Sequence, residues 1–386
     1  MAVLSDAQRD AGWTIAKLGD ITTKIGSGST PRGGKSSYVD EGPMVIRSQN
    51  VLDNELDLSD VAHVPEELTA KLKSVLVQKG DTLLNITGSG NTTIGRSALV
   101  NEDLGEAYVN QHVCIIRPNK SLVNEIFLQK SIFAFKDELL GLSYGSTRDA
   151  LTKGIIESFE IPLPPLKEQE RIAGILGSLD DKIEANTRLI QTLDSLGEAA
   201  TRKYLKSVQK TQKLNDIAHI VMGQSPKGET LNTEGSGVLF FQGKKDFGFR
   251  YPTPRTYTTA ATRMAEPLDI LFSVRAPIGA LNRSVEACCV GRGLAAIRSS
   301  CGQENTLFYT LKTNPNLWEK FEGEGTIFSA INKKGLSELD IPFSETAISN
   351  GVEDFLTSVE QEIFSLEQEN LQLAETRDAL IKRLIG

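Results

Sequence analysis

The chain has 386 residues, 39% hydrophobic and 24% charged, with a formal net charge of −8. No apolar run approaches the roughly 18 residues that a membrane-crossing helix needs, and residues 1–13 lack the apolar centre of a secretory signal. We therefore expect a cytoplasmic protein with no membrane contact, long enough to build two cores.

The first part of the chain, residues 1–163, is typical of a mixed α and β domain. Apolar and β-branched runs between glycine-rich turns predict strands at Met44–Arg47, Thr82–Ile86 and Val113–Ile116. A helix is expected around Asn124–Leu140, and a last strand ends at Ile161-Pro162. We interpret these residues as the first of two domains.

A long amphipathic helix is predicted for residues 164–208. Pro162, Pro164 and Pro165 would break a helix interior but suit a helix entry, where a missing amide donor has no partner to lose. The helix should begin near Pro165 or Leu166. Its apolar residues recur at spacings near three and four and form a narrow stripe: Ile172, Leu176, Leu179, Ile183, Ile190, Leu193 and Leu196.

The second half of the chain repeats the first. Ile341-Pro342 repeats Ile161-Pro162 at an offset of 180 residues. Further upstream the matches continue with small gaps, and they pair Lys17–Ile21 with Lys213–Ile217, Gly28–Pro31 with Gly223–Pro226, Asp81–Leu83 with Asp269–Leu271, and Val109–Arg117 with Val290–Arg298. The loops between these segments differ, which predicts a pseudo-two-fold repeat of two binding domains with different targets.

The second copy should have the same parts as the first. Residues 209–342 are expected to form the second domain, with a helix around Glu304–Phe321, and residues 343–386 the second long helix. The apolar stripe of that helix consists of Val352, Leu356, Val359, Ile363, Leu366, Leu373, Leu380 and Leu384. We expect an α+β protein with two α/β domains separated by two long helices.

Neither apolar stripe is expected to remain in water. The simplest outcome is that the two helices pack on each other as a coiled coil, and docking of both helices on another protein is the alternative. Asn186 falls among the apolar positions of the first helix. It either sets the register of the helix pair or lies on the surface, and the sequence leaves both interpretations open.

The negative charge is unevenly distributed. Residues 343–386 hold nine acidic and three basic residues, a net of −6, so the other 342 residues carry only −2. Residues 239–300 hold nine basic and four acidic residues, a net of +5. That segment is either a solvated mixed surface or a surface that faces nucleic acid, because phosphate binding requires cations.

Nothing in the sequence predicts a catalytic or metal site. An adenine methyltransferase needs an Asn/Asp-Pro-Pro-aromatic loop, but Pro164-Pro165 lies between two leucines. Gly26-Ser-Gly28 and Gly88-Ser-Gly90 lack the G-x-G-x-x-G spacing of a dinucleotide loop and are interpreted as hairpin turns. The four cysteines show no C-x-x-C spacing, so buried thiols are expected.

These residues carry a family resemblance. The junction Ile161–Asn186, with its proline turn followed by Lys167-Glu-Gln169, Ile172-Ala173 and Leu179-Asp180, is similar to the central junction of the specificity subunits of type I restriction-modification systems. Further segments also fit: Gly26–Pro31, Asn110-Gln-His112, Ser146-Thr147 and Arg377–Leu384. The second junction departs from the pattern, because Phe343-Ser-Glu-Thr-Ala follows Pro342.

The resemblance implies a non-catalytic reader of double-stranded DNA. Each domain would recognise one half of a split target, and the two helices, antiparallel to each other, would fix the spacer between the halves. Two methyltransferase (modification) subunits would dock on the helices and methylate adenine with S-adenosylmethionine, so no cofactor is expected in this chain. ATP-dependent restriction subunits can join such complexes. The alternative is a stand-alone DNA-binding or coiled-coil scaffold protein.

Candidate DNA contacts are polar and basic residues in or beside the divergent loops, because Arg and Lys can contact guanine or phosphate and Asn and Gln can pair with adenine. In the first copy they are Ser27, Ser29, Thr30, Arg32, Lys35, Arg47, Gln49, Asn50, Asn91, Arg96, Thr147 and Arg148. In the second copy they are Gln224, Ser225, Lys227, Gln242, Lys244, Lys245, Arg250, Tyr251, Arg255, Arg275 and Arg292. For Gln111 and His112 we expect structural hydrogen bonds instead.

Overall fold

The computed structural model describes residues 3–28, 38–70, 72–88, 93–142, 150–321 and 330–386. The chain divides into two compact units, which we call unit 1 (Met1–Ile183 with Gln372–Gly386) and unit 2 (Glu184–Leu371). Each unit contains one copy of the repeat and a segment of each long helix.

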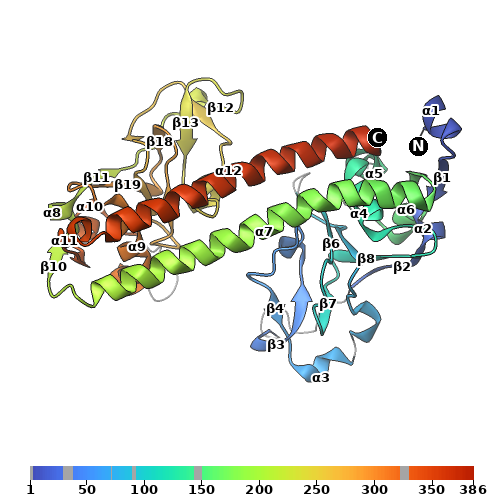
Figure 1. Cartoon of the computed structure of the whole chain (residues 1–386), viewed down its shortest axis with the longest axis horizontal. Coiled ribbons are helices and arrows are strands. Elements are labelled where there is room, and N and C mark those ends of the chain that lie inside the picture. The colour runs from blue at the N-terminus through green and yellow to red at the C-terminus, as the bar shows by residue number, and fades with distance from the viewer. Residues whose placement is uncertain (1–2, 29–37, 71, 89–92, 143–149, 322–329) are drawn as a thin grey trace. The chain divides into compact units, whose positions relative to one another are not determined.

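Unit 1 contains two small sheets and a strand pair (Figure 1). The antiparallel sheet has the order β2 (Thr22–Ser27), β8 (Val113–Pro118), β5 (Thr82–Asn85) and β6 (Ser97–Leu99). The other sheet has the order β4 (Ala62–His63), β3 (Val39–Ile46) and β7 (Ala107–Val109), with β3 and β7 parallel. The strand pair is β1 (Thr14–Lys17) with β9 (Glu160–Leu163). Six short helices accompany the described strands: α1 (Asp6–Asp10), α2 (Leu18–Ile21), α3 (Glu66–Thr69), α4 (Glu125–Ala134), α5 (Lys136–Gly141) and α6 (Lys153–Ser158).

Unit 2 has the same plan. Its antiparallel sheet has the order β11 (Ala218–Met222), β19 (Leu294–Ser299), β16 (Ile270–Ser273) and β17 (Leu281–Arg283). Its other sheet has the order β12 (Leu231–Asn232), β14 (Tyr257–Thr258), β13 (Val238–Phe241), β18 (Cys288–Val290) and β15 (Met264–Ala265), with β13 and β18 parallel. The pair β10 (Thr211–Lys213) with β20 (Asp340–Pro342) corresponds to β1 with β9. The described short helices are α8 (Leu214–Ile217), α9 (Glu304–Thr313), α10 (Lys333–Ser337) and α11 (Thr346–Ser349).

The structure confirms the predicted repeat, down to a matched ion pair. Arg117 Nε donates to Asp81 Oδ1 at 2.7 Å in unit 1, and Arg298 Nε donates to Asp269 Oδ1 at 2.7 Å in unit 2. Asp81 and Asp269 are both almost fully buried, where an unpaired carboxylate would be costly. Corresponding strands are therefore joined in both copies by the same ion pair to a buried carboxylate.

A glycine ends the first strand of each antiparallel sheet, at a position where no side chain fits. A Cβ on Gly28 would lie 1.7 Å from the carbonyl oxygen of Val109, and a Cβ on Gly223 would lie 2.1 Å from that of Gly291. Gly26 and Ser27 lie within β2, so the interpretation of Gly26-Ser-Gly28 as a hairpin turn is wrong. Glycine is required there because two backbone segments approach closely.

The two long helices are α7 (Leu166–Leu205), which begins where predicted, and α12 (Val352–Leu384). In unit 2 they run antiparallel: Asn186 Nδ2 donates to Glu369 Oε2 at 2.7 Å and to Asn370 Oδ1 at 2.9 Å, and Tyr204 donates to the carbonyl of Ser344 at 2.7 Å. Asn186 is buried. It is therefore a polar contact between the helices and not a surface residue.

The stripe residues have four different environments. Ile190, Leu193, Val359, Ile363 and Leu366 form a helix-to-helix core in unit 2. Other stripe residues pack into the domain cores: Ile172, Leu176, Leu380 and Leu384 in unit 1, and Val352 and Leu356 in unit 2. Leu179, Ile183 and Leu373 are half-buried. Leu196 is 47% exposed, so its assignment to the apolar stripe was wrong.

The predicted domain helices are each interrupted. Asn124–Leu140 divides into α4 and α5 at Phe135, and the 304–321 segment becomes α9 followed by a 3-10 helix at Pro315–Phe321. Asn124 caps α4 by accepting from the backbone amides of Ile126 and Phe127. Pro315 explains the second interruption, because its ring removes an amide donor and clashes with the preceding turn.

Candidate nucleic-acid interface

In unit 2, four predicted residues meet at the ends of β11, β13 and β18. Ser225 donates to Gln242 Oε1 at 3.0 Å, and Arg292 Nε donates to Ser225 Oγ at 3.3 Å. The backbone amide of Gln224 donates to the carbonyl of Val290 at 2.9 Å. We call Gln224, Ser225, Gln242 and Arg292 the loop cluster. It offers amide, hydroxyl and guanidinium groups on one surface.

Two exposed lysines continue this surface. Lys244 and Lys245 lie in a 3-10 turn directly after Gln242. The turn is held by Asp246, whose Oδ2 accepts from the backbone amides of Gln242 at 2.6 Å and Gly243 at 3.2 Å. The side chain of the only acid in this turn is thus engaged with the backbone, while the lysines remain available to an anion.

Most basic residues of the 239–300 segment are exposed. The exposed ones are Lys244, Lys245, Arg255, Arg263, Arg275 and Arg292. Lys227 is also exposed, on the turn that follows Ser225. Arg275 and Arg292 lie on adjacent backbone segments. The backbone amide of Val274, which precedes Arg275, donates to the carbonyl of Gly293, which follows Arg292. Arg263 was not chosen from the sequence, although it belongs to the same basic segment and its carbonyl accepts from the amide of Val290 at 2.9 Å.

The prediction that Arg250 contacts DNA is wrong. Its side chain is only 2% exposed and pairs with Asp194 of α7 and, at 3.3 Å, with Glu360 of α12. The guanidinium also lies 4.4 Å from the ring centroid of Phe308. A cation enclosed by carboxylates and aromatic rings is not available to DNA. Tyr251 is half-buried, and its ring packs edge-on against Phe364 with centroids 5.3 Å apart.

In unit 1, Arg47 and Gln49 are held by the loop that contains Asp60. Arg47 Nη2 donates to the carbonyl of Asp60 at 2.9 Å, and Gln49 Nε2 donates to Asp60 Oδ2 at 2.9 Å. The Arg47 guanidinium also lies 5.6 Å from the ring centroid of Tyr38. Gln49 and Ser27 are exposed, and Arg96 is half-buried.

The prediction that Asn50 contacts DNA is also wrong. It is buried, accepts from the backbone amide of Arg47 at 3.0 Å and donates to the carbonyl of Asp57 at 2.9 Å. These bonds fix the turn that presents Gln49, so the role of Asn50 is to shape the loop. Seven further predicted residues lie outside the described residues: Ser29, Thr30, Arg32, Lys35, Asn91, Thr147 and Arg148.

The prediction of structural hydrogen bonds at Gln111 and His112 is confirmed. His112 Nδ1 lies 2.6 Å from the hydroxyl of Thr87, and Gln111 Nε2 lies 3.2 Å from His112 Nε2. Within the described parts of the chain, no cluster of His, Cys, Asp or Glu has the arrangement of a metal site. No helix among those parts has the length and apolar character to cross a membrane.

Known proteins resemble this chain over most of its length. Residues 11–195 match the family model for the type I restriction modification DNA specificity domain. The protein assigned as the MjaX type I restriction enzyme specificity subunit of Methanocaldococcus jannaschii is 28% identical, over 97% of this chain and 92% of the relative. The HindI specificity subunit of Haemophilus influenzae is 27% identical over 53% of this chain and 44% of its own length.

A solved structure supports the fold. The type I restriction-modification S subunit from M. genitalium, whose crystal structure is known, is 16% identical in sequence to this chain. The superposition covers 97% of this chain and 96% of the M. genitalium chain, with a TM-score of 0.55. The duplicated sheets and the long helices together define a protein with two related domains. The chain is therefore similar to the specificity subunits of type I restriction-modification systems.

Proposed function

We propose that this chain is the non-catalytic DNA-recognition subunit of a type I restriction-modification complex, and that each copy of the repeat reads one half of a split target in double-stranded DNA. One observation carries the proposal. The two copies share the order of their antiparallel sheet and an Arg–Asp ion pair with a buried carboxylate, but the loops at the strand ends present different polar and basic residues. A common frame with different loops suits two readers of unlike sequences.

The helices have the second role in the proposal. We infer that α7 and α12 pair as an antiparallel coiled coil, fix the spacer between the half-sites and provide the docking surface for two modification subunits. The domain limits 1–163, 164–208, 209–342 and 343–386 remain part of this proposal. Adenine methylation with S-adenosylmethionine, and any ATP-dependent cleavage, belong to the partner subunits.

The test is to alter the loops of one copy at a time in the complete complex. Replacing Gln242, Lys244 and Lys245 with alanine should relax or abolish recognition of one half-site, because these groups lie on the exposed loop surface of unit 2. Replacing Ser27, Arg47 and Gln49 should affect the other half-site. Sequencing of methylated DNA reads out both halves of the motif. The proposal fails if both variants alter the same half.

A further inference from the structure

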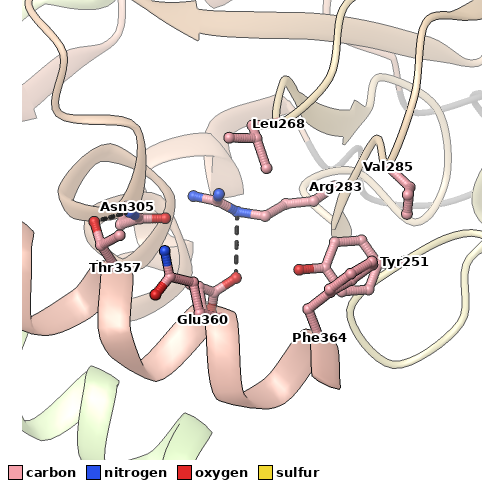
Figure 2. Close-up of a pocket in the computed structure, with 9 residues that line it drawn as sticks. Tyr251, Leu268, Arg283, Val285, Asn305, Thr357, Glu360 and Phe364 are labelled. Atoms are coloured by element: carbon pink, nitrogen blue, oxygen red, sulfur yellow. Dashed lines mark hydrogen bonds and ion pairs between the residues drawn. The ribbon is translucent and has the colours of Figure 1, made fainter. Parts of the chain in front are cut away.

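Unit 2 contains a cavity of about 270 Å³ beside α12 (Figure 2). Its lining residues come from the second copy and from α12, and they include Tyr251, Leu268, Arg283, Val285, Glu360 and Phe364. The apolar rim is open to solvent, since Leu268 is 52%, Val285 44% and Phe364 36% exposed. None of these residues belongs to the loop cluster, although Tyr251 is among the candidate DNA contacts predicted from the sequence.

The cavity ends at a buried ion pair that leaves hydrogen-bonding capacity unused. Arg283 Nε and Glu360 Oε2 lie 3.5 Å apart, and their side chains are 1% and 6% exposed. Neither atom has a hydrogen-bond partner among the described residues. Figure 2 shows both groups between the other lining residues, with the Tyr251 hydroxyl pointing toward them.

The backbone at Leu268 is strained. Its φ is +70°, in the left-handed region that bulky residues avoid. Leu268 follows Pro267 in a turn in which the amide of Asp269 donates to the carbonyl of Glu266 at 3.1 Å, and glycine is the usual residue at this turn position. Strain of this kind persists where the exposed side chain has a use.

The corresponding turn of the first copy has a glycine in place of the leucine. Gly80 occupies the same position with φ +90°, and its amide donates to the carbonyl of Val100 at 2.9 Å, as that of Leu268 donates to Ser284 at 2.8 Å. The strand contact that aligns Val100 with Ser284 also aligns Asn101 with Val285. The second copy has therefore replaced a glycine and an asparagine with two exposed apolar residues on the cavity rim.

Size and charge identify the occupant. Small-molecule sites usually enclose about 300–1,000 Å³, so this cavity fits a single anchoring side chain better than a cofactor. Exposed carboxylates adjoin the rim residues in sequence: Glu266 near Leu268, Glu286 next to Val285, and Glu362 near Phe364. These carboxylates repel DNA phosphates and attract a basic protein segment.

We propose that this cavity is the anchor site for one large apolar side chain of a modification subunit, carried on a segment with basic residues on either side. This inference rests on the proposed function, in which α12 belongs to the docking surface, and the cavity is continuous with that helix. The two apolar rim residues Leu268 and Val285 correspond to Gly80 and Asn101 in the first copy, so the two docking positions differ at the rim.

The test restores the first copy's residues, in the double variant Leu268→Gly, Val285→Asn of the full chain. Binding of the purified cognate modification subunit is measured by calorimetry, together with the thermal midpoint of the chain alone. We expect binding at the unit 2 position to weaken at least tenfold, because a filled apolar pocket is a typical hot spot. The midpoint should stay equal or rise, because glycine relieves the strain at residue 268.

Two further variants separate this outcome from a general defect. Leu122→Ser removes an apolar residue of unit 1 that is 43% exposed, and it should leave binding unchanged. Glu286→Lys should weaken binding and reduce its dependence on salt, because it opposes a basic segment.

Wild-type binding at both positions with no change in the double variant would overturn the anchor site while leaving the proposed function intact. Absence of wild-type binding to the modification subunit would instead overturn the proposed function. A double variant with a lowered midpoint and weakened binding would show a structural role for Leu268 and also contradict the inference.

Discussion

At the residue scale, buried charge is concentrated where the second copy meets the helices within unit 2. Arg250 and Arg283 both approach Glu360, and Lys312 pairs with Asp194 and, at 3.2 Å, with Glu198. Removing one member of such a group leaves another charge without a partner, at a cost of about 3–5 kcal/mol. These residues therefore hold the base of the recognition loop in place rather than contact DNA.

One carboxyl group in this region makes stability depend on pH. Burial raises the pKa of Glu367 from 4.5 to about 7, although its Oε1 accepts from the amide of Arg250 at 3.2 Å. The folded state therefore holds the proton more tightly than the unfolded state. Folding takes up a proton between these two pKa values, so the stability of unit 2 falls as pH rises through this range.

Glu367→Gln should remove this dependence. A neutral amide keeps an acceptor for Arg250 and is never charged, so the variant should be more stable than the wild type at pH 8, by on the order of 1–3 kcal/mol, and nearly equal at pH 5. Urea unfolding at the two pH values measures the difference. Glu362→Gln, an exposed position on the same helix, is the matched control. An unchanged pH slope in the Glu367 variant would exclude Glu367 as its source.

At the scale of elements, each antiparallel sheet depends on a close crossing of backbone segments. Gly223 ends β11 and donates from its amide to the carbonyl of Leu294 at 2.9 Å, and a Cβ there would collide with the carbonyl of Gly291. This crossing brings Gln224 and Ser225 to Gln242 and Arg292. The loop cluster therefore depends on a residue with no side chain.

Gly223→Ala should destabilise unit 2 by about 1–3 kcal/mol, because the backbone must move to admit the methyl group. It should also impair reading of the second half-site. Gly228→Ala is the control, since nothing lies within 4 Å of a Cβ at that position. Thermal unfolding and methylated-DNA sequencing measure the two effects. Equal stability of both variants would mean that the crossing tolerates a side chain.

Much of this arrangement could be predicted from sequence, because repeated strand patterns and helical spacing are local signals. The central strands, the start of α7 and the correspondence between copies were all predicted. The burial of Arg250 could not be, because Asp194 lies 56 residues away and Glu360 lies on another helix. An arginine in a basic segment has the same local pattern whether it faces solvent or a distant carboxylate.

At the scale of the whole molecule, the length of the two helices should set the spacing between the half-sites. A seven-residue insertion in each helix, between Ile183 and Leu196 in α7 and between Ile363 and Leu373 in α12, preserves a heptad stripe and adds about 10 Å at 1.5 Å per residue. Because DNA rises about 3.4 Å per base pair, the unread spacer should grow by up to about three base pairs.

Both half-site sequences should stay the same in the lengthened chain, because the recognition loops are untouched. Sequencing of DNA methylated by the complex measures the spacer and the half-sites together. Insertion in one helix alone, which shifts the register of Asn186 against Glu369 and Asn370, is the control and should impair assembly. An active complex with an unaltered spacer would show that the helices do not set the distance.

The composition of unit 1 has a consequence for biosynthesis. Ile381 and Ile385 of α12 are fully buried in the same core as Leu18, Ile156 and Ile172. During synthesis, the first copy emerges from the ribosome long before those two isoleucines are added to the chain. The core of the nascent first copy is therefore incomplete when it emerges, because it lacks these two side chains. It is completed only after about 200 more residues have been added, at roughly 5–20 residues per second. During that interval its apolar surface is a natural substrate for chaperones.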